Sequence, residues 1–131
     1  MKTQREAIAK LYELTAGQTS LDVTKIFRHA DVFPLFMQKL DMKTLNAIAD
    51  DYIINPTIVW ATQRSVDPKQ VAAIIMTPVT KWFTDIEGSP DVPLVLRRST
   101  GRNYLWDGHH RMSAALLLEL PNLRCKRVQV K

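Results

Sequence analysis

The sequence has a single cysteine and no long apolar run. The lone thiol, Cys125, excludes an intramolecular disulfide and a cysteine-rich metal site, and we expect it to be a small buried residue. No stretch approaches the roughly 20 apolar residues that cross a bilayer. The opening residues, MKTQREAIAKLYEL, lack the apolar core of a secretory signal. These absences predict a cytoplasmic protein that does not enter a membrane.

Acidic residues are also in the minority, with 13 Asp and Glu against 18 Lys and Arg and a formal net charge of +5. After Val95 only Asp107 and Glu119 oppose the basic residues, which are Arg97, Arg98, Arg102, Arg111, Arg124, Lys126, Arg127 and Lys131. A positive balance favours anionic partners such as nucleic acid or nucleotides. The alternative is a basic surface that has no partner.

The 131 residues are enough for one compact core, and 46% hydrophobic with 24% charged residues is the composition of a globular chain. The sequence contains no internal repeat and no low-complexity segment. We therefore expect one domain, with an appendage at most.

The first half of the chain is predicted to be helical. Thr3 to Glu6 form a capping-box pattern, and Gly17 is placed to end the helix that follows. Further short helices are expected over 19–27, 32–40 and 42–51, the last capped by Asp41. Such a run of short helices is also the pattern of a helix-turn-helix DNA-binding motif. Because no single helix has a basic face, we favour helices that pack on each other. His29, within this stretch, is expected at the surface or at a cap.

The second half alternates strands and helices. Asn55-Pro56 interrupts the helical pattern, which predicts a boundary near residue 56. The elements expected after it are a strand at 57–60, a helix that starts at Asp67-Pro68, a short helix around 79–86, a hairpin of 93–98 and 103–106, a helix at 109–120 and a strand at 126–130. The predicted fold is therefore α/β (α+β), a small mixed sheet with helices over 57–131, preceded by an N-terminal helical segment, 1–56.

The residues Asp107-Gly108-His109-His110-Arg111 lie where the second strand of the hairpin runs into a helix. A helix N-terminus offers amides and a partial positive charge, to which Arg111 adds a planar fork of donors that suits phosphate. Adjacent histidines point about 100° apart on a helix, so they cannot chelate one metal, but either could act as an acid or a base. The alternative is that Asp107 caps the helix, Gly108 makes the turn and the histidines lie in solvent.

Two segments resemble a known family. VPLVLRRSTGRNYLWDGHHRMSAALLL and the upstream IVWATQRSVDPKQVAAI resemble the ParB/sulfiredoxin superfamily, in particular phage-type ParB-like domains, over residues 57 to 131. The resemblance implies a Gly-x-x-Arg turn that cradles nucleotide phosphates. By position it assigns the cradle to Gly108, His109, His110 and Arg111, with Gln63 and Arg64 on the loop that faces it. It also implies a nucleoside triphosphate, ATP or CTP, with Mg²⁺.

The sequence departs from two branches of that family. Partitioning proteins have acidic and arginine residues where this chain has two histidines, so we do not expect a DNA-sliding clamp. Sulfiredoxins carry a catalytic cysteine in the turn, where this chain has His109, so peroxiredoxin repair is excluded. Family membership does not fix function.

The leading hypothesis is a ParB-like domain that binds a nucleotide or nucleic-acid phosphate and acts as a nuclease, an NTP hydrolase or a phosphotransferase. Arg111 and the helix amides would neutralise the phosphate, His109 or His110 would be the acid or base, and Asp107 would be the metal carboxylate. A second carboxylate would come from Asp67 or Glu87.

The alternative is a non-catalytic phage accessory protein in a host cytoplasm, which binds DNA through its basic half or inhibits a host protein through its N-terminal helices. A capsid-associated module is a third hypothesis.

Overall fold

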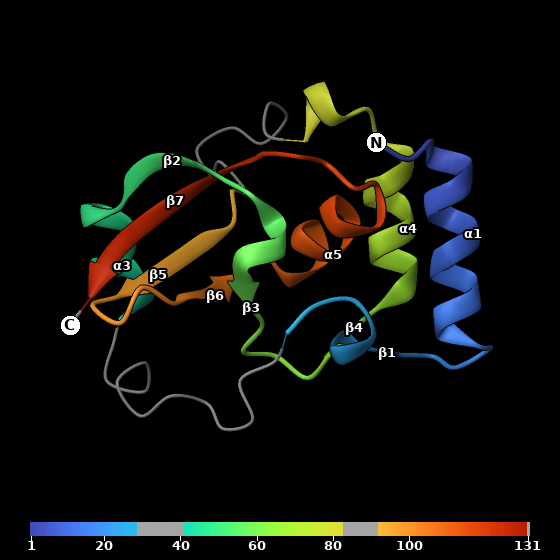
Figure 1. Ribbon diagram of the computed structural model, residues 1–131, viewed down its shortest axis with the longest axis horizontal. Helices are drawn as coiled ribbons and strands as arrows, with labels where there is room; N and C mark the ends of the chain where they lie inside the picture. Colours follow the sequence, from blue (N-terminus) through green and yellow to red (C-terminus); the bar gives the residue numbers. More distant parts are fainter. Residues whose placement is uncertain (29–40, 83–91, 131) are drawn as a thin grey trace.

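The computed structural model describes residues 1–28, 41–82 and 92–130 and shows a mixed α/β fold (Figure 1). Its four α-helices in the described residues are α1 (Gln4–Thr15), α3 (Met42–Ile48), α4 (Pro68–Met76) and α5 (His109–Leu117). The strands are β1 (Leu21–Asp22), β2 (Asp50–Ile54), β3 (Val59–Trp60), β4 (Ser65–Val66), β5 (Leu94–Arg98), β6 (Asn103–Asp107) and β7 (Leu123–Val130). Short 3₁₀ turns cover Val23–Lys25, Pro56–Ile58 and Val79–Lys81. The predicted fold class, a mixed sheet with helices after an N-terminal helix, is confirmed.

The main sheet has five strands in the order β2-β7-β5-β6-β3. β7 runs antiparallel to β2 and parallel to β5, β5 and β6 form the predicted antiparallel hairpin, and β3 is parallel to β6. β1 and β4 pair separately, with Leu21 opposite Val66. Figure 1 shows α5, α4 and α1 side by side at one end of the molecule, with α1 outermost.

Alternate side chains of the sheet enter two hydrophobic clusters, because successive strand residues point to opposite faces. Val95, Leu105 and Cys125 join the larger cluster, to which α1, α4 and α5 contribute. Leu96 and Tyr104 point the other way and pack with Leu45 of α3 in the smaller one. Cys125 is fully buried, as predicted, and burial raises the pKa of its thiol to about 11. Helices α1, α4 and α5 therefore pack on one face of the sheet, and α3 packs on the other.

α1 begins at the predicted capping box. The hydroxyl of Thr3 accepts a hydrogen bond from the Glu6 amide at 3.1 Å, and the Glu6 carboxylate accepts one from the Thr3 amide at 3.1 Å. The helix ends at Thr15, where Ala16 and Gly17 both take positive φ values. Local cap chemistry thus set both ends of this helix.

The chain after α1 differs from the expected helix over 19–27. Leu21 and Asp22 form strand β1, and a 3₁₀ turn over Val23–Lys25 replaces the helix. The Asp22 carboxylate accepts hydrogen bonds from the amide and hydroxyl of Thr24 at 2.9 and 2.7 Å, which stabilises a tight turn in place of an α-helix. The helix expected over 32–40 and the surface position expected for His29 lie outside the described residues.

Asp41 caps α3 as predicted, through its carboxylate and the Thr44 amide at 3.3 Å. The helix ends at Ile48, however, and not at residue 51, because β2 begins at Asp50 and pairs along β7. Asp51 lies 2.9 Å from the ammonium of Lys126 on β7. Cross-strand pairing with a distant segment therefore replaced the last turn of the expected helix.

Two elements that precede residue 57 pack against elements that follow it. The Lys2 amide donates to the Leu118 carbonyl at 2.8 Å, and the Gln4 side chain donates to the Ile75 carbonyl at 3.0 Å. β2 lies in the main sheet next to β7. The predicted division into an N-terminal appendage, 1–56, and a domain, 57–131, stays a prediction.

The remaining elements follow the expected order. Asp67 caps α4, with its carboxylate 2.9 Å from the Lys69 amide, and Pro68 occupies the first helical position. The strand expected at 57–60 starts as a 3₁₀ turn capped by Asn55, and the helix expected around 79–86 begins as a 3₁₀ turn, with its residues after 82 outside the described part. No helix in the described ranges is long and apolar enough to span a bilayer.

Candidate functional site at the start of α5

Gly108 joins β6 to α5 and is the N-cap of the helix, with φ of 95°. A β-carbon at this position would lie 2.8 Å from the Cα and 2.9 Å from the Cβ of Pro93. Glycine is therefore required both by the left-handed backbone and by the contact with Pro93. The alternative prediction that Asp107 caps α5 is wrong, since no described side chain caps this helix and Asp107 is the exposed last residue of β6.

His109 points into the protein and not into solvent, with 4% of its surface exposed. Its Nε2 atom accepts hydrogen bonds from the backbone amides of Thr62 and Gln63, at 3.0 and 3.1 Å. An accepting Nε2 must be unprotonated, so the neutral ring carries its proton on Nδ1. The ring of Phe27 lies beside it, with a centroid distance of 6.3 Å. His109 thereby joins α5 to the segment after β3.

His110 makes a similar contact with a different element. Its Nε2 atom accepts a hydrogen bond from the amide of Asp67, the N-cap residue of α4, at 3.0 Å. Removal of the ring from water lowers the pKa of His110 below its ordinary value of 6.5, while the carboxylates of Asp67 and Asp107 oppose that shift. The charge of His110 is therefore disfavoured, as an acceptor requires.

Together, His109 and His110 with the amides of Thr62, Gln63 and Asp67 form what we call the histidine clamp. Because the two rings lie on neighbouring residues of a helix, they diverge and reach separate parts of the segment between β3 and α4. The alternative prediction that both histidines lie in solvent is wrong. Sequence reasoning could not find these partners, since they are backbone amides that tertiary folding supplies.

The structure places Gln63 and Arg64 in different surroundings. Gln63 meets the turn through its backbone amide, and its side chain donates to the Ser65 carbonyl. The hydrogen bonds from Thr24 are the main cause of the lowered pKa of Asp22, and the charge of Arg64 adds to that lowering. Gln63 is thus brought to the predicted site by its backbone, whereas the charge of Arg64 acts on Asp22.

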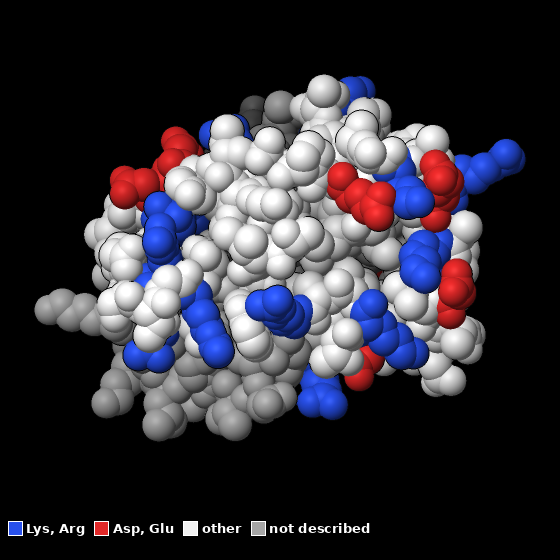
Figure 2. Space-filling model, in the orientation of Figure 1, with Lys and Arg blue, Asp and Glu red and all other residues white. Residues whose placement is uncertain are grey.

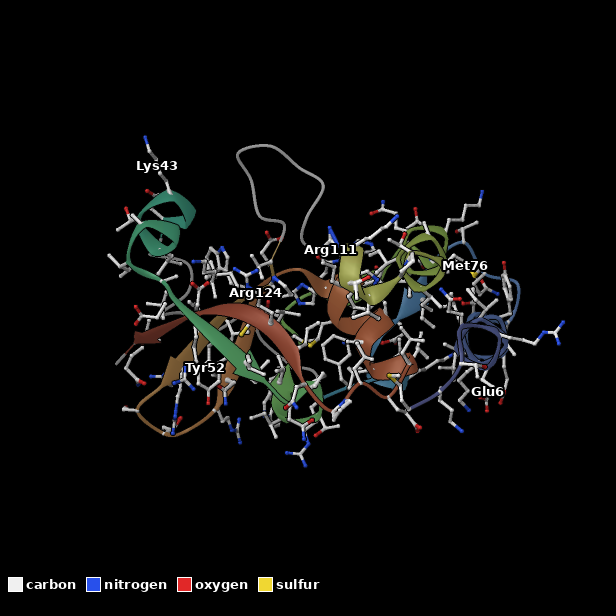
Figure 3. The ribbon with its side chains drawn as sticks, turned by 90° about the horizontal axis from the view of Figure 1, so that it is seen from above. Glu6, Lys43, Tyr52, Met76, Arg111 and Arg124 are labelled. Atoms are coloured by element: carbon white, nitrogen blue, oxygen red, sulfur yellow. The ribbon has the colours of Figure 1, made fainter. Side chains whose placement is uncertain are left out.

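Arg111 is half-buried in the first turn of α5. In the view of Figure 3 it lies between Arg124 on the sheet and Met76 at the end of α4. Asp67 and Asp107 are both near enough to His110 to act on its charge, which brings two of the three predicted carboxylates to the start of α5. Glu87 lies outside the described residues. Within the described ranges, no three His, Cys, Asp or Glu side chains gather as a metal site.

The charges of the visible face are spread out. Figure 2 shows Lys and Arg side chains across its lower half, and Asp and Glu mainly at its upper left and on its right. A hollow of about 940 Å³ lies at the other end of α5, between Leu14, Ile26, Leu116 and Leu120. Its rim mixes Lys10 with Glu13, which are paired at 3.5 Å. We place the candidate site at the N-terminus of α5 and not at this hollow, because the helix amides and Arg111 are suited to bind an anion.

No family model matches the chain, and no curated protein matches it. The likeness to ParB-like domains therefore stays a prediction. What the geometry offers is a helix N-terminus with no side-chain cap among the described residues, an arginine in its first turn, and two histidines that fix the facing segment.

Proposed function

We propose that this protein binds a phosphate-bearing ligand, a nucleotide or a nucleic-acid phosphate, at the start of α5. The observation that carries the proposal is the pairing of a helix N-terminus that no described side chain caps with Arg111 in its first turn. Helix amides and a guanidinium are complementary donors for phosphate oxygens. The net charge of +5 also favours an anionic ligand.

The histidine clamp supports a binding role for the turn. Each Nε2 atom already accepts a backbone hydrogen bond, so neither histidine has that lone pair available to take a proton from a substrate. These three hydrogen bonds instead hold α5 against the segment that would form the other wall of the site. The clamp would keep this wall in place before the ligand arrives, which reduces the cost of ordering it on binding.

The nucleotide that the resemblance implies is ATP or CTP with Mg²⁺. The donors present fit such an ion, because Mg²⁺ in nucleotide sites takes one or two carboxylates together with phosphate oxygens and water. Asp107, exposed at the end of β6, and Asp67 would hold it. Bound there, the metal would supply charge neutralisation to phosphoryl transfer, which is the chemistry of the second candidate function, an NTP hydrolase, nuclease or phosphotransferase.

Calorimetric titration with ATP and CTP, with and without Mg²⁺, tests the proposal. Wild type should bind at least one of them, Arg111→Lys should bind more weakly because it loses the bidentate fork, and Arg111→Ala more weakly still. Arg5→Ala, which removes an exposed charge from α1, is the matched control and should bind as wild type does. Equal affinity of wild type and Arg111→Ala for every ligand would contradict the proposal.

Phosphate release from the same samples separates the candidate functions. A binding domain should release none, whereas an enzyme should turn over with Mg²⁺ and lose activity in Asp107→Asn.

The non-catalytic alternative is a phage accessory protein in the host cytoplasm, whose partner is DNA or a host protein held by the N-terminal helices. Binding of such a partner should persist in Arg111→Ala.

A further inference from the structure

Two arginines from distant parts of the sequence lie over one tryptophan. The guanidinium carbon of Arg102 is 4.4 Å from the centre of the Trp60 ring, and that of Arg28 is 5.5 Å from it. Both distances are within the reach of a cation–π contact. One aromatic ring therefore holds two positive groups in place at the surface.

Backbone hydrogen bonds bring the three residues together. Arg102 ends the turn between β5 and β6, where the Arg98 amide donates to the Arg102 carbonyl at 2.9 Å. The Ala61 amide, next to Trp60, donates to the Arg28 carbonyl at 2.7 Å. Trp60 itself lies in β3, opposite Tyr104 of β6. The positions of these residues are thus set by the sheet and its turns, and not only by their side chains.

The charge of this cluster is not neutralised within the described part of the chain. Arg28 and Arg102 are exposed and make no ion pair with a described carboxylate. By contrast, Arg124 and Lys126 on β7 both lie close to Asp51, at 3.8 and 2.9 Å. A guanidinium stacked on a ring keeps the N–H donors at its edge for a phosphate oxygen.

We propose that Trp60, Arg28 and Arg102 form a site for a single strand of nucleic acid. The two guanidinium groups would bind backbone phosphates, and Trp60 would position them. Sites for single strands combine positive charge along the backbone with aromatic rings, and this cluster has both in one place. This site goes beyond the phosphate site at α5 and does not depend on it, since the arginines concerned are different residues.

Fluorescence anisotropy with a labelled oligothymidine of about 12 nucleotides, a length within the range of single-strand sites, tests the inference. The double variant Arg28→Ala, Arg102→Ala should bind roughly tenfold or more weakly than wild type. Its plot of log affinity against log salt should also be shallower by about 1.4, because each phosphate contact to a single strand contributes about 0.7 to the slope. Arg5→Ala removes one exposed charge elsewhere and should change neither quantity.

Trp60 is a positioning residue in this scheme, and its variants separate positioning from stability. Trp60→Leu should weaken oligothymidine binding, and Trp60→Phe, which keeps a ring under the guanidinium groups, should restore most of it. If both variants lower the unfolding temperature while oligothymidine affinity stays at the wild-type level, Trp60 only supports the fold and the inference fails.

Two further results would overturn the inference. One is a double variant that binds oligothymidine with the affinity and salt slope of wild type. The other is tighter binding of the corresponding duplex than of the single strand. The phosphate site at α5 is tested with ATP and CTP on Arg111→Ala, whereas this site is tested with oligothymidine on the Arg28 and Arg102 variant. Failure of one site can therefore be distinguished from failure of the other.

Discussion

The amide of Asp67 donates a hydrogen bond to Nε2 of His110 across 3.0 Å, and so the first residue before α4 is joined to the first turn of α5. Protonation of Nε2 would replace this acceptor with a donor that faces another donor. We therefore expect the junction of the two helices to weaken as the pH falls.

We predict that stability falls as His110 is protonated. The pKa of His110 is lowered in the folded state, so the unfolded chain binds more protons wherever the two pKa values differ. The contribution of His110 is complete above its ordinary pKa of 6.5 and is lost as the pH falls from there through the lower folded value. Urea unfolding at a series of pH values should show a steeper loss for wild type than for His110→Gln. Parallel pH profiles of the two proteins would contradict this prediction.

We predict that His109→Ala destabilises the fold more than His110→Ala does. His109→Ala removes a buried ring and leaves the amides of Thr62 and Gln63 without an acceptor. His110→Ala removes a half-buried ring and leaves only the amide of Asp67 without one. An unsatisfied buried donor costs about 1–3 kcal/mol, so His109→Ala should cost on the order of 3 kcal/mol. Urea unfolding at neutral pH measures both variants, and a larger loss for His110→Ala would refute the assignment.

We predict that Gly108→Ala is more destabilising than Gly101→Ala. The two glycines have nearly the same φ, 95° and 93°, so the backbone strain of an alanine is matched. Only Gly108 would place its new β-carbon against Pro93, whereas nothing lies within 4 Å at Gly101. Strain alone should cost about 1 kcal/mol at either position, and the contact with Pro93 should add about 1–3 kcal/mol at Gly108. Equal unfolding free energies for the two variants would show that the Pro93 contact does not constrain the turn.

Features set by neighbouring residues were predictable from the sequence. The capping box of Thr3 and Glu6, the cap at Asp67 and the hairpin of β5 and β6 all depend on short-range chemistry, and each is present. β1 and β2 were not predicted, because each pairs with a strand far along the chain. A pattern of apolar residues does not show which distant strand is available.

The candidate site was predictable only in outline. The position of the turn follows from the strand and helix patterns, and Gly108 is where a glycine was expected to matter. The alternative of a cap at Asp107 failed because the N-cap position is Gly108, whose approach to Pro93, just before β5, leaves no room for a side chain. The role of the histidines depends on backbone amides that lie more than 40 residues earlier in the chain, and backbone groups leave no signature in the sequence.

Two-dimensional ¹H–¹⁵N spectra recorded during titration with CTP or ATP, in the presence of Mg²⁺, test most directly whether phosphate binds at the start of α5. We expect saturable shifts of the His109, His110 and Arg111 amides, since these belong to the first turn of the helix and would donate to the phosphate. The same shifts should be much weaker in Arg111→Ala and unchanged in Arg5→Ala. Shifts confined to the hollow around Leu116 and Leu120, or shifts at the first turn that persist in Arg111→Ala, would contradict the account.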